Sequence, residues 1–183
     1  NTLAQGYALR NVEHTIYSTA AERDFFVNRY HFDPARTSII PVGYCDRFRR
    51  LDRAASRAKT GLTGNPVIIW VAFLQRRKNP LLVLDAFKDV AEKFPEARFY
   101  MIGAGEMEGE ARRKISTDPV LSRTAVLKGF IPNQEIPEYL NSADIYVLAS
   151  HNENWGISIV EAMACGCVPV ITNLPASQII SDG

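Results

Sequence analysis

From residue 62 onward, hydrophobic positions alternate between short continuous runs and helical stripes. Residues 67–72 form an apolar run rich in β-branched side chains, which is typical of a strand buried in a parallel sheet. Asn79 and Pro80 then have the pattern of an N-cap followed by proline at the first helical position. The helix predicted after them ends before Pro95 and carries one apolar stripe: Val83, Ala86, Phe87, Val90, Ala91 and Phe94.

The same alternation continues to residue 171. It predicts strands at 98–102, 125–127, 144–148 and 168–171, with helices between them at about 106–115, 132–140 and 156–164. Strand–helix repeats of this spacing form a parallel sheet covered by helices, so we expect an α/β, Rossmann-like three-layer fold. Because ligands of such sheets bind where the strands end, the informative loops are 73–79, 103–106, 129–133 and 150–156.

The first 60 residues have a different pattern. We expect a strand at 15–18, a helix at 20–30 and an extended segment at 38–41 that leads to Gly43. Residues 46–60 are polar, and we interpret them as a linker that contains a helix with a solvated face. A phosphorylated acceptor or a membrane surface is the alternative partner for the five arginines of this segment: Arg47, Arg49, Arg50, Arg53 and Arg57.

Composition narrows the class of protein. The 183 residues, 46% of them hydrophobic, suffice for one core and part of another, but not for two complete domains. The 21 Lys and Arg nearly balance the 20 Asp and Glu, which argues against a nucleic-acid-binding protein. No apolar run approaches the roughly 20 residues that span a bilayer. Cys45, Cys165 and Cys167 indicate reduced thiols rather than a disulfide framework or a metal site, so we expect a cytoplasmic protein.

Candidate site residues are densest around the helix predicted at 156–164. This helix is almost wholly apolar, which predicts burial, yet it carries Glu161, whose carboxylate then needs a partner from elsewhere in the fold or from a ligand. Glu153 lies in the loop before it. Gly156 and Ile157 begin the helix with unpaired amides, which attract phosphate or sugar hydroxyls. On spacing alone, a helix cap at Glu153 and an internal hydrogen bond at Glu161 are equal alternatives.

From residue 153 to residue 170, the sequence resembles the signature of retaining GT-B glycosyltransferases. That family has two glutamates separated by seven residues, then Ala-Met-Ala, a glycine and Pro-Val. Glu153 and Glu161 fit this pattern, and residues 162–170 follow in register. Further segments also resemble the family: 39–43 the interdomain segment, 75–80 the phosphate-binding loop, and 103–105, 129–131 and 142–144 its strand ends. The resemblance covers about residues 12–183.

The resemblance implies a donor-binding domain for a sugar linked to UDP, GDP or ADP, and it implies the role of each site residue. Lys78 and Glu153 are the catalytic residues in this interpretation: Lys78 neutralises the leaving diphosphate, and Glu153 contacts the transferred sugar. Glu161 accepts hydrogen bonds from the ribose. The other implied substrate-binding residues are Gly156 and Ile157 through their amides, Trp155 and Arg77 beside them, Phe130 and Ile131 against the base, and Gly43 near the donor.

The family acts without a metal or other cofactor, and the sequence contains no Asp-x-Asp pair, the usual motif of metal-dependent sugar transferases. One departure is Phe73, where the family usually has arginine, and phenylalanine does not neutralise phosphate. Arg76 and Arg77 are the candidates for that charge, and without it transfer would be slow or absent; a solvated loop charge is the alternative interpretation of Arg77. The alternative is a non-catalytic domain of the same fold that binds sugar nucleotides or serves a structural role. An epimerase of this fold is disfavoured by the spacing of the glutamates.

By the same resemblance, residues 1–45 are the end of an N-terminal domain and the interdomain segment. Residues 46–183 are the donor-binding domain, incomplete at its C-terminus. The partners implied are the sugar nucleotide, a glycan or lipid-linked acceptor, and the missing N-terminal domain, which would complete the active site. We expect that the 183 residues alone bind a sugar nucleotide weakly without transferring the sugar. Peripheral attachment to the inner membrane stays open as an addition to the cytoplasmic location.

Overall fold

The computed structural model describes residues 6–8, 11–153 and 156–174, and the chain divides into two compact units. The smaller unit holds the described residues up to Gly43, together with Glu153 and Gly156, and the larger one holds residues 44–152 and 157–174. The elements of the smaller unit are β1 (Thr15–Tyr17), α2 (Ala20–Tyr30), η1 (Pro34–Arg36) and β2 (Thr37–Ile39), and β1 and β2 pair in parallel. The expected strand, helix and extended segment are therefore present.

The larger unit is built on a parallel sheet with the strand order β5-β4-β3-β6-β7. Its strands are β3 (Val67–Val71), β4 (Arg98–Ile102), β5 (Ala125–Gly129), β6 (Ile145–Leu148) and β7 (Val168–Ile171). The order reverses between β3 and β6, as in other doubly wound sheets, and β3 is central and nearly completely buried. The expected Rossmann-like α/β fold is confirmed, and Trp70, expected in the core, has no exposed surface.

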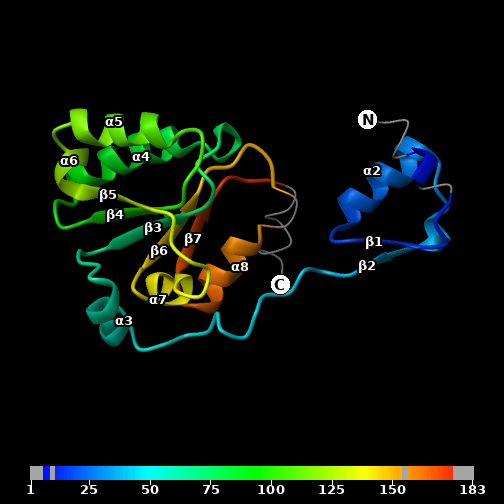
Figure 1. The fold of residues 1–183 in the computed structure, drawn as a ribbon, viewed down its shortest axis with the longest axis horizontal. Helices are drawn as coiled ribbons and strands as arrows, with labels where there is room; N and C mark the ends of the chain where they lie inside the picture. The colour runs from blue at the N-terminus through cyan, green and yellow to red at the C-terminus, as the bar shows by residue number, and fades with distance from the viewer. Residues whose placement is uncertain (1–5, 9–10, 154–155, 175–183) are drawn as a thin grey trace. The chain divides into compact units, whose positions relative to one another are not determined.

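Helices cover both faces of this sheet in two groups, seen above and below it in Figure 1. In one group, three helices pack against one another: α4 (Pro80–Lys93), α5 (Glu108–Thr117) and α6 (Leu121–Thr124). The other comprises α3 (Arg53–Thr60), α7 (Ile136–Asn141) and α8 (Ile157–Ala164). A single turn, η2 (Arg76–Lys78), lies between β3 and α4. The short helix α6 has no counterpart among the sequence-based predictions.

Two predictions about helix faces are wrong in part. The stripe on α4 is buried at Val83, Phe87 and Ala91, but Ala86 is exposed and Phe94 lies beyond the helix with 58% of its surface exposed. Helix α8 is not buried all round, because it packs on α7 and on strands β6 and β7 through one side. Ile159 and Ala162 lie on that side, whereas Ile157 and Met163 are exposed.

The expectation of a solvated arginine face on residues 46–60 is also wrong for Arg53 and Arg57. The guanidinium group of Arg53 donates to Oδ1 of Asp144 at 2.6 Å, and that of Arg57 donates to Oδ2 at 2.8 Å. Oδ2 also accepts a hydrogen bond from the amide of Val67 at 2.8 Å. Asp144 thus joins α3 to the start of β3. These half-buried pairs are charge-assisted hydrogen bonds, which are stronger than bonds between neutral groups.

No helix in the described part of the chain is long and apolar enough to cross a membrane. The three cysteines are free thiols, with Cys45 exposed and the other two buried. Burial raises the pKa of the Cys165 thiol to about 11 and that of Cys167 to about 12. Both thiols therefore stay protonated and unreactive near neutral pH.

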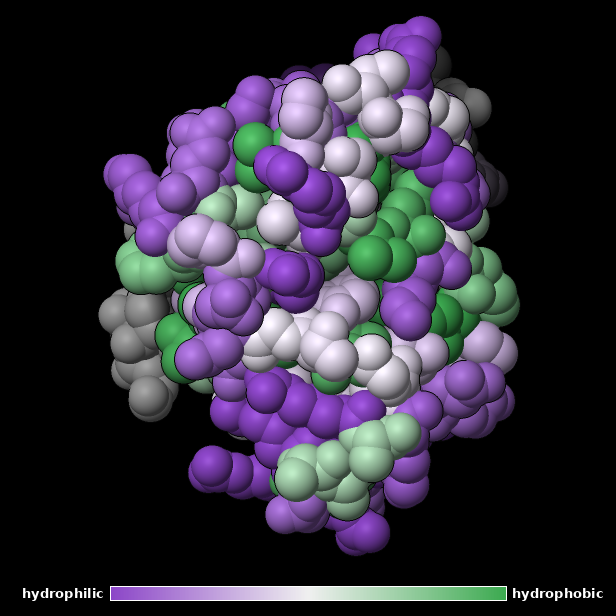
Figure 2. Space-filling model, turned by 90° about the vertical axis from the view of Figure 1, so that its left-hand side faces the viewer, coloured by the Kyte–Doolittle hydropathy of each residue, from purple (hydrophilic) through white to green (hydrophobic). Residues whose placement is uncertain are grey.

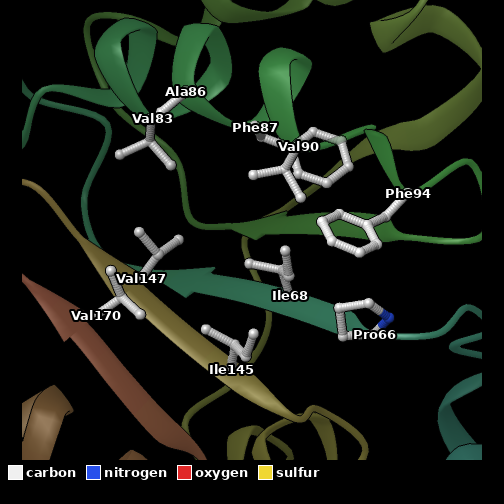
Figure 3. A pocket seen from close by; sticks show the side chains of 10 residues that line it. All are labelled: Pro66, Ile68, Val83, Ala86, Phe87, Val90, Phe94, Ile145, Val147 and Val170. Atoms are coloured by element: carbon white, nitrogen blue, oxygen red, sulfur yellow. The ribbon is translucent and has the colours of Figure 1, made fainter. Parts of the chain in front are cut away.

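An apolar groove lies between α4 and the face formed by β3, β6 and β7 (Figure 3). Its volume is about 380 Å³, and its lining is entirely apolar: Pro66, Ile68, Val83, Ala86, Phe87, Val90, Phe94, Ile145, Val147 and Val170. A diphosphate would lose its hydration there without gaining a polar partner, so this groove is not the site of a charged ligand. The side of the molecule shown in Figure 2 is mostly hydrophilic with scattered apolar areas, as on an ordinary solvated surface.

Candidate active site at the carboxyl edge of the sheet

The backbone after β3 runs in close contact with the loop after β4. The amide of Leu74 donates to the carbonyl of Ala104 at 3.0 Å, and the amide of Met107 donates back to the carbonyl of Leu74 at 3.0 Å. Gly103 has a φ of +140° and lies so close that a Cβ atom there would overlap the carbonyl oxygen of Ala72. The glycine is therefore needed for the close approach that builds this edge of the site.

The turn η2 follows and carries three consecutive cations. Lys78 is only 8% exposed, and among the described residues it is the one charged side chain in the buried class. Arg76 and Arg77 are both exposed. The turn therefore holds one cation in a largely enclosed position at the edge of the sheet where ligands bind.

Asn79 follows η2 and is the N-cap residue of α4, with Pro80 at the first helical position as predicted, but it does not cap the helix with its side chain. Its backbone is left-handed, with φ 50° and ψ 48°, and its side chain makes no capping hydrogen bond. The side-chain amide instead donates to the carbonyl of Ala149 at 2.9 Å. The amide of His151 donates to the carbonyl of Arg77 at 2.8 Å. The turn is thus fastened to the loop between β6 and α8, which is possible because β3 and β6 are neighbours.

Helix α8 begins at this same edge and places Glu161 one turn inside. Burial raises the pKa of the Glu161 carboxyl group, and the nearby charge of Arg47 partly opposes the rise. Arg47 lies over the ring of Phe48, 5.5 Å from its centroid, and Phe48 is itself buried. The sequence predicted that Glu161 needs a partner from elsewhere in the fold or from a ligand, and the charge of Arg47 acts on it from outside α8. Near the start of α8, Ser158 bonds to the hydroxyl of Tyr146 at 2.8 Å.

At the end of β5, Phe130 is 72% exposed and Ile131 is half-buried. The carbonyl of Gly129 accepts the amide of Gly103 at 2.8 Å, so this loop adjoins the loop after β4. The larger unit therefore carries Lys78, Arg77, Ile157, Phe130 and Ile131 at the carboxyl edge, with Glu161 a turn behind it. Strand ends of a doubly wound sheet are where ligands bind.

The remaining candidates do not belong to the described part of the larger unit. Gly43, Glu153 and Gly156 belong to the smaller unit, so their place beside Lys78 stays a prediction. Trp155 lies outside the described residues. Within those residues, no three His, Cys, Asp or Glu side chains gather into a group able to hold a metal ion. No local pattern predicts the contacts of Asn79 and His151, because both bridge segments about 70 residues apart.

Comparison with known proteins gives a consistent result. The family model for glycosyl transferases group 1 matches residues 52–182. The D-inositol 3-phosphate glycosyltransferase of Geodermatophilus obscurus is 31% identical over 179 residues, which are 92% of this chain and 40% of that protein. The mannosylfructose-phosphate synthase of Agrobacterium fabrum is 28% identical over 89% of this chain and 38% of its own length.

Among solved structures, the crystal structure of Anabaena HepE in complex with UDP and glucose has the same fold, with a TM-score of 0.81. It is 21% identical, and the match covers 97% of this chain and 49% of that one. The chain thus spans about 40% of the length of the curated relatives it matches and about half of this solved structure.

Proposed function

The chain belongs to the glycosyl transferases group 1 family, and from this premise we propose that it carries the donor site of a sugar transferase. The donor is a nucleoside diphosphate sugar, and the acceptor is a hydroxyl group of a glycan or a lipid-linked glycan. Transfer proceeds with retention at the anomeric carbon and without a metal or another cofactor. The observation that carries the proposal is the position of the largely buried Lys78 in the turn η2, at the carboxyl edge of the sheet.

The chemistry explains why a cation belongs there. The bond between the anomeric carbon and the diphosphate oxygen breaks, and its electron pair leaves with the diphosphate. The acceptor oxygen forms the new bond to the same carbon, and its proton passes to the departing diphosphate. Negative charge therefore grows on the diphosphate, and a fixed cation lowers the barrier because it is already oriented toward that charge. Lys78 takes this role, together with the amides at the start of α8.

The remaining candidate residues orient the donor. Glu161 accepts hydrogen bonds from the ribose, and Glu153 and the amides of Gly156 and Ile157 hold the transferred sugar. The loop after β5, with exposed Phe130 and half-buried Ile131, forms a surface for the base. Trp155 and Gly43 complete the donor site, and the acceptor side comes from a domain preceding these residues in the full-length protein. The non-catalytic alternative is not favoured, because the matched relatives are named for sugar transfer or synthesis.

Isothermal titration of the full-length protein with UDP-, GDP- and ADP-sugars tests this function. We expect saturable binding of one of them in a buffer that contains EDTA, followed by transfer when an acceptor is added. If a folded sample bound none of the three, the proposed function would be wrong.

Glu161→Gln tests the role of the ribose contact. We expect the affinity for the bound sugar nucleotide to fall by about 10- to 100-fold, because a carboxylate is a stronger acceptor than an amide. Glu92→Gln on the exposed side of α4 is the matched control and should leave the affinity unchanged. Equal affinities of the two variants would remove Glu161 from the site.

A further inference from the structure

Phe73 leaves the end of β3 without a charge, although its side chain is 64% exposed. It lies between Ala72 and Leu74, whose backbone amides are both bonded. The amide of Ala72 donates to the carbonyl of Ile102 at the end of β4 at 3.2 Å, and the amide of Leu74 donates to the carbonyl of Ala104 in the following loop at 3.0 Å. Since the backbone there is held in place, no local rearrangement brings another side chain to position 73. If a second cation serves the diphosphate, it comes from the turn η2.

The two arginines of η2 are held in different ways. Arg76 is directed toward α5: its amide bonds to Glu106, and its guanidinium group lies 3.8 Å from Glu110. Arg76 also lines a small pocket of about 220 Å³ with residues of α4, Met107 and His151. A carboxylate already partly neutralises its charge, so Arg76 is poorly suited to hold a diphosphate.

Arg77 is directed toward the loop after β6, the other strand that pairs with β3. Its guanidinium group donates to Oε1 of Gln75 at 3.2 Å and, in a longer contact of 3.5 Å, to the carbonyl of Asn152. Its own carbonyl accepts the amide of His151 at 2.8 Å. Each of these partners is neutral, and none is a carboxylate. The group is therefore oriented along the loop that leads into α8 while it keeps its full charge.

We propose that Arg77, and not Arg76, supplies the second positive charge for the donor diphosphate and thereby replaces the charge absent at position 73. This inference rests on the proposed function, because it assigns a residue to the same donor site. Gln75 and the loop at 149–152 act as positioning elements: they hold the turn and the guanidinium group before the ligand arrives. Such preorganisation reduces the cost of ordering a long side chain on binding.

Titration of the full-length protein separates the contribution of the diphosphate from that of the nucleoside. The probes are the nucleoside diphosphate that binds best among UDP, GDP and ADP, and its nucleoside. Arg77→Ala should weaken binding of the diphosphate by about tenfold or more and leave nucleoside binding unchanged, because only the charged contact is lost. Arg76→Ala, the matched control from the same turn, should leave both affinities unchanged. Phe73→Arg added to Arg77→Ala should restore binding of the diphosphate.

Equal diphosphate affinities of Arg77→Ala and Arg76→Ala, with binding by the unchanged protein intact, would overturn this inference and leave the proposed function standing. Failure of the unchanged protein to bind any of the three diphosphates would overturn both. If Phe73→Arg brought no recovery, the claim that positions 73 and 77 supply the same charge would be wrong.

Discussion

Lys78→Met in the full-length protein is expected to lower kcat for sugar transfer by about 100- to 1000-fold, the range measured when one preorganised charge-stabilising group is removed from an active site. Methionine keeps the length and apolar stem of lysine and removes only the charge. Because the side chain is 8% exposed, water is largely prevented from taking over the role of the ammonium group.

The melting temperature of the same variant is measured beside kcat. Loss of activity together with retained stability would distinguish a functional lysine from a structural one. Lys93→Met, on an exposed position in the last turn of α4, is the control and should change neither quantity. A Lys78→Met enzyme with unchanged kcat would exclude the lysine from the reaction.

Gly103→Ala is expected to lower the free energy of unfolding by about 3 kcal/mol, as the sum of a strained backbone and an overpacked contact. The new Cβ would overlap the carbonyl oxygen of Ala72, which is backbone and cannot rotate away. The φ of +140° is in addition unfavourable for any residue with a side chain.

Chemical denaturation measures this effect, with Gly109→Ala as the control. Gly109 lies in α5, where an added Cβ meets no atom within 4 Å, so alanine there should stabilise the protein by about 0.5–1 kcal/mol. If both variants unfolded at the same denaturant concentration, the close approach of the two loops would not exist as described.

Local patterns in the sequence predicted the fold well. The strand at Val168–Ile171 and the helix at Ala20–Tyr30 have the predicted bounds. The period of the hydrophobic positions and the residues that end an element are both local features, so the sequence shows them directly. Helix α8 shows where such reasoning ends. Its composition predicts burial on all sides, but burial depends on which elements pack against it, and Ile157 and Met163 remain exposed.

The candidate site was predictable in outline and not in its contacts. The position of Lys78 followed from the motif, whereas its burial depends on the packing of η2 at the end of β3. The side chain of Asn79 bonds across 70 residues to Ala149, and the charge of Arg47 reaches Glu161 from a distant segment. No spacing rule connects such pairs, since only the tertiary fold brings them together.

Hydrogen exchange of the full-length protein, with and without the sugar nucleotide it binds, tests the location of the donor site directly. The account predicts slower exchange in peptides that cover residues 73–79, 129–131 and 157–161, and no change in α5 (Glu108–Thr117). Saturable binding that protected the apolar groove beside α4, and left those three segments unchanged, would contradict a donor site at the carboxyl edge of the sheet.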